Sequence, residues 1–380
     1  MNNLDTLVTG GMLRIPREFV RSTLSKATVL NMFCHVPLVS EGDGQSLQVG
    51  APVSEGAVIQ VPAGCHVSLL LEDSSIIRLP SNAALKIMAL RKYALEDAIE
   101  VRLDLTQGRV ELEVNKRQGK SAPFEVRTPL SVMGVRGTEF RVGYSAADKT
   151  AQVEVLDGIV ATQGSADLKP LVLTKGLGLP IDGQGKAQAV EKLLAPPEIA
   201  SAEVAPERSA GFIIRLRPIA AAKSYVVDET QTANLTSTRR AQNLQAPQLL
   251  ISELSPHASF YRLSAVSASG LIGVPKSYAF CLAGVNSVNT HCSALFDVPL
   301  ANDALISFAL IRTGVDGRAS QTIRTDTLKA HQGQIQIRGL QPGHYNWQLS
   351  YSTQPDTRSR RYDVVHRESG SFELIALPPH

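Results

Sequence analysis

The feature that most constrains the fold is a regular succession of short apolar runs, separated by turn residues, between residues 26 and 180. Many runs alternate apolar and polar side chains, as in 98–105 (AIEVRLDL), where the isoleucine, valine and leucines fall on one face. Gly, Asp, Asn or Pro separates the runs at intervals of roughly 8–12 residues, which is typical of sandwiches and barrels. This segment is therefore predicted to be all β.

The composition changes at residues 181–210, which are rich in Ala, Pro, Glu and Gly. Pro196, Pro197 and Pro206 prevent a continuous helix, so this segment is interpreted as a linker. Strand-like patterns then resume in two sets, 211–284 and 285–380, and each set has a length that suits a small sandwich.

The two C-terminal sets resemble each other. Residues 253–263 (ELSPHASFYRL) and 338–349 (RGLQPGHYNWQL) both place a leucine and a proline turn before an aromatic strand. This similarity indicates an internal duplication.

Charge and hydropathy exclude two classes of partner. Lys and Arg total 38 against 35 Asp and Glu, and a net charge of +3 spread over 380 residues does not indicate a nucleic-acid partner. No window approaches the roughly 18 apolar residues of a membrane span. The first residues, MNNLDTLVTGG, also lack the basic start and apolar core of a secretory signal, which taken literally predicts a cytoplasmic protein.

The cysteines do not have metal-site spacing, because the chain contains no C-x-x-C. Cys34 and Cys65 each precede a histidine in a strand-like run, where neighbouring side chains point to opposite faces. Both are therefore interpreted as small buried hydrophobes and not as ligands. Whether Cys281 and Cys292 form a disulfide is left open by the sequence.

Catalytic and cofactor motifs are missing from the sequence. The glycines at 183–187 (GQGKA) lack the first glycine and the hydroxyl residue of a phosphate-binding loop. There is no G-x-S-x-G motif, and the eight histidines are scattered singly. The chain is therefore predicted to be no enzyme, with no catalytic residue, no metal site and no cofactor.

Tyr345 and Trp347 lie two residues apart, so that a strand would place both rings on one face. Two interpretations remain open. The rings could anchor a sandwich core, or they could form an exposed aromatic surface for a sugar or a peptide.

Residues 126–142, VRTPLSVMGVRGTEFRV, form the most distinctive segment of the chain. The segment resembles the hallmark of FecR-type domains, T-P-x-x-V-x-G-V-R-G-T-E-F-x-V. The matching residues are Thr128, Pro129, Gly134, Arg136, Gly137, Thr138, Glu139 and Phe140. Segments at 47–57, 69–79, 105–114 and 153–160 resemble further family patterns, with Ser74 standing where a hairpin glycine is usual.

The resemblance implies a domain organisation. A FecR-type β-sandwich or jelly roll is expected at 26–180, followed by two small fibronectin type III-like β-sandwiches at 211–284 and 285–380. Residues 7–16 resemble the end of a LysM module, so 1–25 are interpreted as a LysM remnant and linker. Two explanations are then open: the start of the chain lies downstream of the true start, or the gene has lost its 5′ end. In either case a signal peptide is expected to have been lost by truncation.

The resemblance also implies a function. The main interpretation is a non-enzymatic protein of the bacterial cell envelope or periplasm, whose partners are envelope proteins or peptidoglycan. The alternative is an extracytoplasmic sensor of a signalling system related to iron-uptake sigma regulators. A carbohydrate-binding module is a more remote alternative. Oligomeric state and ligand are not predicted.

Within the hallmark segment the residues are given structural roles. Pro129 is expected to fix a bend, and Gly134 and Gly137 to need a positive φ or a close backbone approach. Phe140 is expected to enter the core together with Val142. Arg136 and Glu139 are expected to pair across a bulge.

Overall fold

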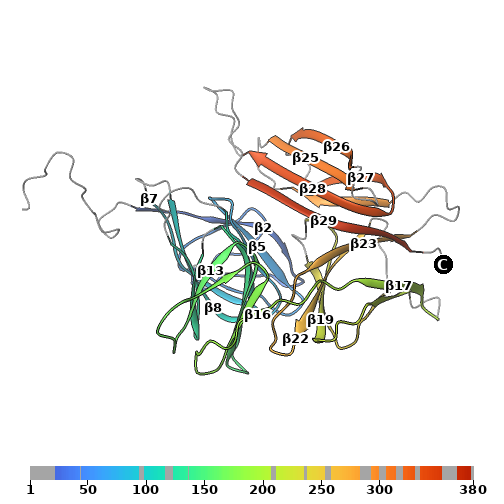
Figure 1. The fold of residues 1–380 in the computed structure, drawn as a ribbon. Helices are drawn as coiled ribbons and strands as arrows, with labels where there is room; N and C mark the ends of the chain where they lie inside the picture. Colours follow the sequence, from blue (N-terminus) through green and yellow to red (C-terminus); the bar gives the residue numbers. More distant parts are fainter. Residues whose placement is uncertain are drawn as a thin grey trace, which may run out of the picture.

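The computed structural model contains only strands and irregular segments in the part of the chain that it describes. The described residues are 22–42, 44–93, 98–115, 123–135, 137–206, 211–234, 238–252, 258–282, 292–298, 305–313, 320–329, 334–352 and 366–377. The prediction of an all-β chain built from β-sandwiches is confirmed (Figure 1). Residues 1–21 of the predicted LysM remnant lie outside the described residues.

The N-terminal unit, residues 22–192, consists of two facing β layers that share one long strand. Its strands are β1 (Ser22–Leu24), β2 (Ala27–Phe33), β3 (Pro52–Val53), β4 (Val58–Gln60), β5 (His66–Leu71), β6 (Ile76–Leu79), β7 (Ala84–Tyr93), β8 (Ala98–Glu113), β9 (Phe124–Thr128), β10 (Ser131–Val135), β11 (Glu139–Ser145), β12 (Thr150–Asp157), β13 (Ile159–Gly164), β14 (Leu171–Thr174), β15 (Leu177–Ile181) and β16 (Glu191–Lys192). One layer has the order β14-β13-β10-β9-β8-β7, and the other has the order β5-β6-β8-β11-β12-β15.

Strand β8 changes layers near Gly108. Its first part pairs with β7 and β9, and the part from Gly108 onwards pairs with β11. Gly108 has φ of 79°, and a Cβ there would lie 2.3 Å from the carbonyl oxygen of Asn82. Glycine is required at this corner because both the positive φ and the close backbone approach exclude a side chain.

The core of this unit lies between the two layers. Alternation along β8 and β11 points Val110, Leu112, Phe140 and Val142 inward, where all four are buried. The opposite face of the same strands carries charged side chains, and it is this face that the rest of the chain covers.

Cys34 and Cys65 form a disulfide in this unit. Their interpretation as separate buried hydrophobes was wrong. Cys65 is buried and lies one residue before β5, whose partner strand β2 ends one residue before Cys34. Strand pairing therefore brings the two sulfur atoms together, a contact between segments 31 residues apart.

The middle unit, residues 199–282, is a sandwich of a three-stranded and a four-stranded sheet. The first sheet has the order β17 (Ile199–Val204), β18 (Phe212–Leu216), β21 (Gln248–Ile251). The second runs β20 (Thr238–Leu244), β19 (Ala222–Thr230), β22 (Ser259–Ser267), β23 (Lys276–Leu282). The segment 181–210, expected to be a linker, thus contains β16 and β17.

The C-terminal unit, residues 292–377, repeats this arrangement in part. Its strands are β24 (Cys292–Asp297), β25 (Leu305–Thr313), β26 (Ser320–Lys329), β27 (Gln334–Leu340), β28 (Gly343–Ser352) and β29 (His366–Leu377). β24 pairs with β27, and β29-β28-β25-β26 form the facing sheet. The aromatic parts of the two similar sequence segments form β22 and β28. β22 lies between β19 and β23 in its sheet, and β28 lies between β25 and β29.

Strand β29 joins the two C-terminal units edge to edge. It pairs with β28 along most of its length, and residues 373–377 run parallel to β23, which makes one eight-stranded sheet (Figure 1). Leu377 is fully buried in the core of the middle unit. Cys281 of β23 and Cys292 of β24 form a disulfide, which answers the question that the sequence left open.

Tyr345 and Trp347 lie in the core of the C-terminal unit, with relative exposures of 1% and 5%. Tyr345 stacks on Phe372 and donates a hydrogen bond of 2.6 Å to the carbonyl oxygen of Gln341. The Trp347 ring packs against Gly370, where a Cβ would lie 2.7 Å from the ring. The interpretation of these rings as an exposed binding surface was therefore wrong, and the core interpretation is correct.

Candidate functional site

A row of alternating charges crosses the outer face of the N-terminal unit. Strand register places Arg78 of β6 opposite Glu111 of β8, Glu111 opposite Arg141 of β11, and Arg141 opposite Glu154 of β12. Directly opposed side chains of opposite charge stabilise neighbouring strands. The row arises because each strand contributes its outward residue at the same level of the sheet.

The middle unit covers this row through Arg262 of β22. The Arg262 guanidinium makes two hydrogen bonds of 2.8 Å to the carboxylate of Glu111, and it also binds Asp228 of β19 at 2.9 Å. The three side chains keep only 16–18% of their exposure. We name this group the clasp, because it ties a strand of the middle unit to a strand of the N-terminal unit through a bidentate pair.

Glu154 anchors the loop between β22 and β23. Its carboxylate is fully buried and accepts hydrogen bonds from Arg109 at 2.7 Å and from the backbone N–H of Ile272 at 3.0 Å. Arg141 donates from Nη2 to the carbonyl oxygens of Ile272 and Gly273. Side chains of the N-terminal unit thus bind both a donor and acceptors of this loop.

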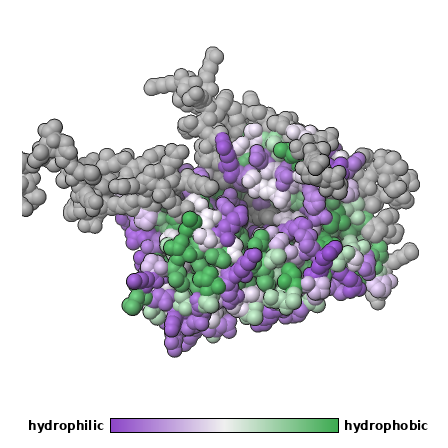
Figure 2. All heavy atoms as spheres, viewed as in Figure 1, coloured by the Kyte–Doolittle hydropathy of each residue, from purple (hydrophilic) through white to green (hydrophobic). Residues whose placement is uncertain are grey.

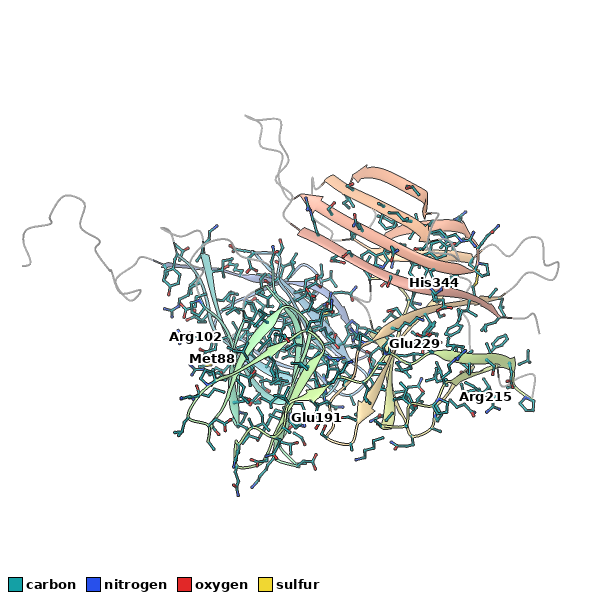
Figure 3. The ribbon with its side chains drawn as sticks, in the orientation of Figure 1. Met88, Arg102, Glu191, Arg215, Glu229 and His344 are labelled. Atoms are coloured by element: carbon teal, nitrogen blue, oxygen red, sulfur yellow. A yellow bond between two sulfur atoms is a disulfide. The ribbon has the colours of Figure 1, made fainter. Side chains whose placement is uncertain are left out.

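A second contact between the two units lies beside this loop. Ser269 donates a hydrogen bond of 2.9 Å to the carboxylate of Glu191, which Figure 3 labels where the units meet. The backbone N–H of Val274 also donates to the carbonyl oxygen of Leu194, which lies in the segment that joins the two units. Polar contacts at Ser269, Gly270, Ile272 and Gly273 therefore hold this loop against the N-terminal unit.

Burial and mutual charge interactions shift the pKa values of the three clasp residues. Burial raises the pKa of Glu111, but the positive charges of Arg262, Arg141 and Arg78 outweigh burial and lower that pKa to about 2. Burial raises the pKa of Asp228, and Arg262 offsets this only in part while Glu111 adds to it. Burial lowers the pKa of Arg262, but the two carboxylates raise it above its ordinary value. At neutral pH, Glu111 and Arg262 are therefore an ionised pair.

A cavity of about 620 Å³ lies between the units beside the clasp. Its charged lining consists of Arg78, Arg109, Glu111, Arg141, Asp228 and Arg262. The lining also includes hydroxyl side chains, one histidine and five amide side chains; the amides are Asn82, Gln107, Gln152, Gln242 and Asn243. The volume is that of a typical small-molecule site.

The floor of the cavity depends on Gly143 of β11. A Cβ at this position would lie 2.8 Å from Oε1 of Gln152 and 3.2 Å from Cζ of Arg109. Glycine therefore leaves room for these two side chains to lie over the strand.

The rim is held in place by local contacts. Asn82 has φ of 62°, which few residues other than glycine adopt, and it lies against Gly108 at the corner of β8. The neighbouring Ser81 donates a hydrogen bond of 2.8 Å to the carbonyl oxygen of Cys65. The Cys34–Cys65 disulfide thus supports the same wall of the cavity.

The charged groups of the cavity are four guanidiniums and two carboxylates. No cluster of three or more His, Cys, Asp or Glu side chains with metal-site geometry occurs among the residues that the structure describes. What the cavity offers is guanidinium and amide groups, which recognise polar and anionic molecules.

None of the hallmark residues that the structure describes lines the cavity, but Glu139 and Phe140 begin β11, and later residues of β11 do line it. Thr128 and Ser131 are paired across a two-residue turn at Pro129 and Leu130, and their hydroxyl oxygens are 2.8 Å apart. The predicted bend at Pro129 is therefore a β-hairpin turn. Gly137 has φ of 62°, as expected for a position that favours glycine.

The expectation for Gly134 was wrong. Gly134 lies inside β10 without a positive φ, and nothing lies within 4 Å of the position that its Cβ would occupy. The carbonyl oxygen of Gly137 would instead be 2.7 Å from a Cβ on Gly158, so these two glycines form the close approach. Thr138 is buried and its carbonyl oxygen accepts a hydrogen bond from Val114.

The remaining hallmark residues begin β11. Phe140 enters the core as expected, and Glu139 is exposed. Arg136 lies outside the described residues, so its pairing with Glu139 stays a prediction. Ser74, where a glycine was expected, has φ of 66°, the conformation that glycine adopts at no steric cost.

Sequence reasoning missed the charged row. The signal was present, since 109–113 (RVELE) and 152–154 (QVE) alternate charged or polar residues with core valines and leucines. Such alternation is ordinarily read as a solvated face. Only the register and the covering unit show that this face is buried.

Comparisons with known proteins agree with the resemblance found in the sequence. The sequence model "FecR protein" matches residues 57–161, which is less than a third of the chain. This segment is therefore similar to the FecR family, as predicted. No protein of curated function matches the chain.

Among solved structures, a "putative anti-sigma factor" from Parabacteroides distasonis is 20% identical with a TM-score of 0.30, and the match covers 36% of this chain and 59% of that one. The chicken CNTN1 FN1–FN3 domains are 9% identical with a TM-score of 0.16, over 59% of this chain and 94% of theirs. The extracellular domain of BT4673 from B. thetaiotaomicron is 10% identical with a TM-score of 0.16, over 87% and 52%. The fibronectin type III-like and LysM assignments stay predictions.

Proposed function

We propose that this chain is an extracytoplasmic sensor or regulatory protein of a signalling system, related to the sigma regulators of the FecR family. The observation that carries the proposal is the FecR match at residues 57–161, the segment that supplies β6, β8, β11 and β12 to the charged cavity. The match favours the sensor over the envelope interaction protein that is the main interpretation of the sequence.

The cavity supports the proposal because of where it lies. A ligand bound between two units changes the free energy of separating them by its differential affinity for the joined and separated states. The clasp and the loop at Ile272 are the contacts that such a ligand would reinforce or weaken. A small molecule could thereby alter the surface that the chain presents to a protein partner.

Two disulfides support a location outside the cytoplasm. Disulfides persist in oxidising compartments such as the periplasm and are rare in the bacterial cytosol. Cys34–Cys65 and Cys281–Cys292 account for all four cysteines of the chain. Periplasmic or envelope location is therefore part of the proposal. No helix among the described residues is long and apolar enough to cross a membrane.

Deleting the gene in its host and comparing transcripts tests the regulatory role. A regulator predicts a small, coherent set of transcripts that changes on deletion and is restored by the wild-type chain, but not by an Arg262→Ala variant of equal abundance. An unchanged transcript profile in conditions where the chain is abundant contradicts the proposal.

A second candidate function is protein docking in the envelope without signalling. Val132, Ile159 and Val172 are 40%, 56% and 62% exposed on the outward face of β10, β13 and β14. Figure 2 shows apolar residues gathered where Figure 1 places β13. Among the described strands β14 pairs only with β13, so its outer edge is open to an extended segment of an envelope protein.

Lysine substitutions at Ile159 and Val172 test the docking function. They should abolish crosslinking to an envelope partner while the melting temperature changes little, because both side chains are exposed. Crosslinking that is unchanged in the double variant contradicts it.

A further inference from the structure

We propose that the cavity binds a small polar ligand bearing an oxyanion group, a carboxylate or a phosphate, and that Arg78 is the residue that binds this group. This inference deepens the proposed sensor function by naming the class of ligand. It rests on how many hydrogen bonds each of the four arginines around the cavity makes to protein acceptors.

Three of the four arginines each make at least two hydrogen bonds to protein acceptors. Arg262 is bound to Glu111 and Asp228 through four hydrogen bonds. Arg141 donates to two carbonyl oxygens of the loop, and Arg109 donates to Glu154 and to the carbonyl oxygen of Gly270. These three side chains join the units. Arg262 has one N–H donor left, whereas Arg141 donates only from Nη2 and its buried Nε, like that of Arg78, has no hydrogen-bond acceptor among the described residues.

Arg78 differs from these three. Its one hydrogen bond among the described residues runs from Nη2 to Glu113 at 3.0 Å. A guanidinium carries five N–H donors, so four of those on Arg78 have no acceptor among the described residues, and one of the four, the Nε donor, is buried. A side chain that is only 19% exposed and lines the cavity thus keeps unused donors. An unpaired buried donor such as this Nε is costly, and an oxyanion bound to the guanidinium would satisfy it.

Arg109 can reach the same oxyanion. The register of β6 on β8 pairs Arg78 with Glu111, which makes Arg109 its diagonal neighbour on the same face. Diagonal neighbours have Cα atoms roughly 7–8 Å apart, within reach of long side chains. Arg109 uses two of its donors, is 24% exposed and lines the cavity. The two guanidiniums therefore form an anion-binding pair.

The charged groups that face the cavity include more guanidiniums than carboxylates. Four arginines line the cavity, against the carboxylates of Glu111 and Asp228. Glu113 and Glu154 pair with arginines but do not line it. With these two carboxylates counted, four arginines are matched by four carboxylates, so the attraction for an anion comes from the donors of Arg78 that lack an acceptor and not from net charge.

The rest of the lining selects the body of the ligand. The amide groups of Asn82, Gln107, Gln152, Gln242 and Asn243 offer both donors and acceptors. These amides can bind hydroxyl or amide groups of a ligand, and the apolar part of the lining can pack against its C–H surface. The class is therefore an acidic or phosphorylated sugar, or a molecule with equivalent groups.

Calorimetric titration of the full chain tests the inference, with three probes of one shape: glucuronate, glucose 6-phosphate and glucose. Binding of either anionic probe, together with at least tenfold weaker binding of glucose, supports it, and the stronger of the two anions identifies the preferred oxyanion. Equal binding of all three probes, or binding of none, overturns it.

Two variants and a control assign the site. Arg78→Gln should weaken the anion at least tenfold, whereas Arg91→Gln, which breaks a similar pair with Glu55 outside the cavity, should not change binding. Asn243→Ala, an exposed rim position, should weaken the probe about threefold and leaves the core intact. Anion binding that neither cavity variant alters places the ligand elsewhere and overturns the assignment.

The two proposals fail separately. An anion that binds through Arg78 without any transcript change on deletion leaves the ligand assignment standing and contradicts the regulatory role. A transcript change on deletion without anion binding supports the regulatory role and contradicts the ligand assignment.

Discussion

We expect removal of Arg262 to destabilise the contact between the N-terminal and middle units by more than the loss of a solvent-exposed ion pair would. Arg262→Ala leaves Glu111 and Asp228 without their shared partner, at sites where each keeps less than a fifth of its exposure. Losing one member of a buried ion pair costs about 3–5 kcal/mol. Because residual exposure screens part of this, we expect a loss of about 3 kcal/mol in the free energy of unfolding.

Urea unfolding followed by far-ultraviolet circular dichroism measures this loss. With a slope of about 3 kcal/mol per molar urea, the midpoint should fall by roughly 1 M. The matched control is Arg91→Ala, whose bidentate pair with Glu55 is 43% exposed on the arginine side and should cost no more than about 1 kcal/mol. Equal losses in the two variants would refute the reasoning.

A triple variant separates charge from packing. Replacing Arg262, Glu111 and Asp228 together by Met, Leu and Leu removes every clasp charge, and such replacements of buried ion pairs are often neutral or stabilising. We expect this variant to recover most of the stability lost in Arg262→Ala. A triple variant as unstable as the single one would mean that the arginine acts through its shape.

The other predictions concern pH and three glycines. The pKa of Glu111 is lowered to about 2 from 4.5, so its contribution to folding stability is complete above about pH 4.5 and is lost as pH falls towards 2. Glu111→Gln should therefore flatten the fall in melting temperature between these pH values. A variant whose melting temperature falls as steeply as that of the wild type would contradict the assignment. Gly137→Val should unfold the N-terminal unit because of the φ of 62°, whereas Gly134→Ala should change stability by less than about 1 kcal/mol; circular dichroism melts compare them, and equal losses would contradict the structure. Gly370→Val should cost about 2 kcal/mol by displacing the Trp347 ring, seen as altered fluorescence of the single tryptophan, and an unchanged spectrum would refute the contact.

The sequence was a good guide to the fold wherever the pattern is local. Alternation in β8 and β11 predicts which side chains are buried, and the turn at Pro129 and the positive φ of Gly137 follow from local backbone chemistry. Tyr345 and Trp347 show the limit of that approach. Their spacing fixes that they share a face, but only the opposing sheet decides whether that face is core or surface.

The candidate site could not be predicted because it depends on contacts between distant segments. Arg262 lies 151 residues from Glu111 along the chain, and no local pattern joins them. The disulfide of Cys34 and Cys65 and the pairing of β29 with β23 have the same origin. Long-range register and the docking of one unit on another decided these features.

Hydrogen exchange at the amide of Ile272 tests most directly whether the charged row holds the two units together. This N–H donates to the buried Glu154 carboxylate across the boundary between units, although it belongs to a loop. We predict exchange as slow as that of the neighbouring strand β22, accelerated in Arg262→Ala as the units separate. Exchange at the rate of an open loop in the wild-type chain would contradict the account.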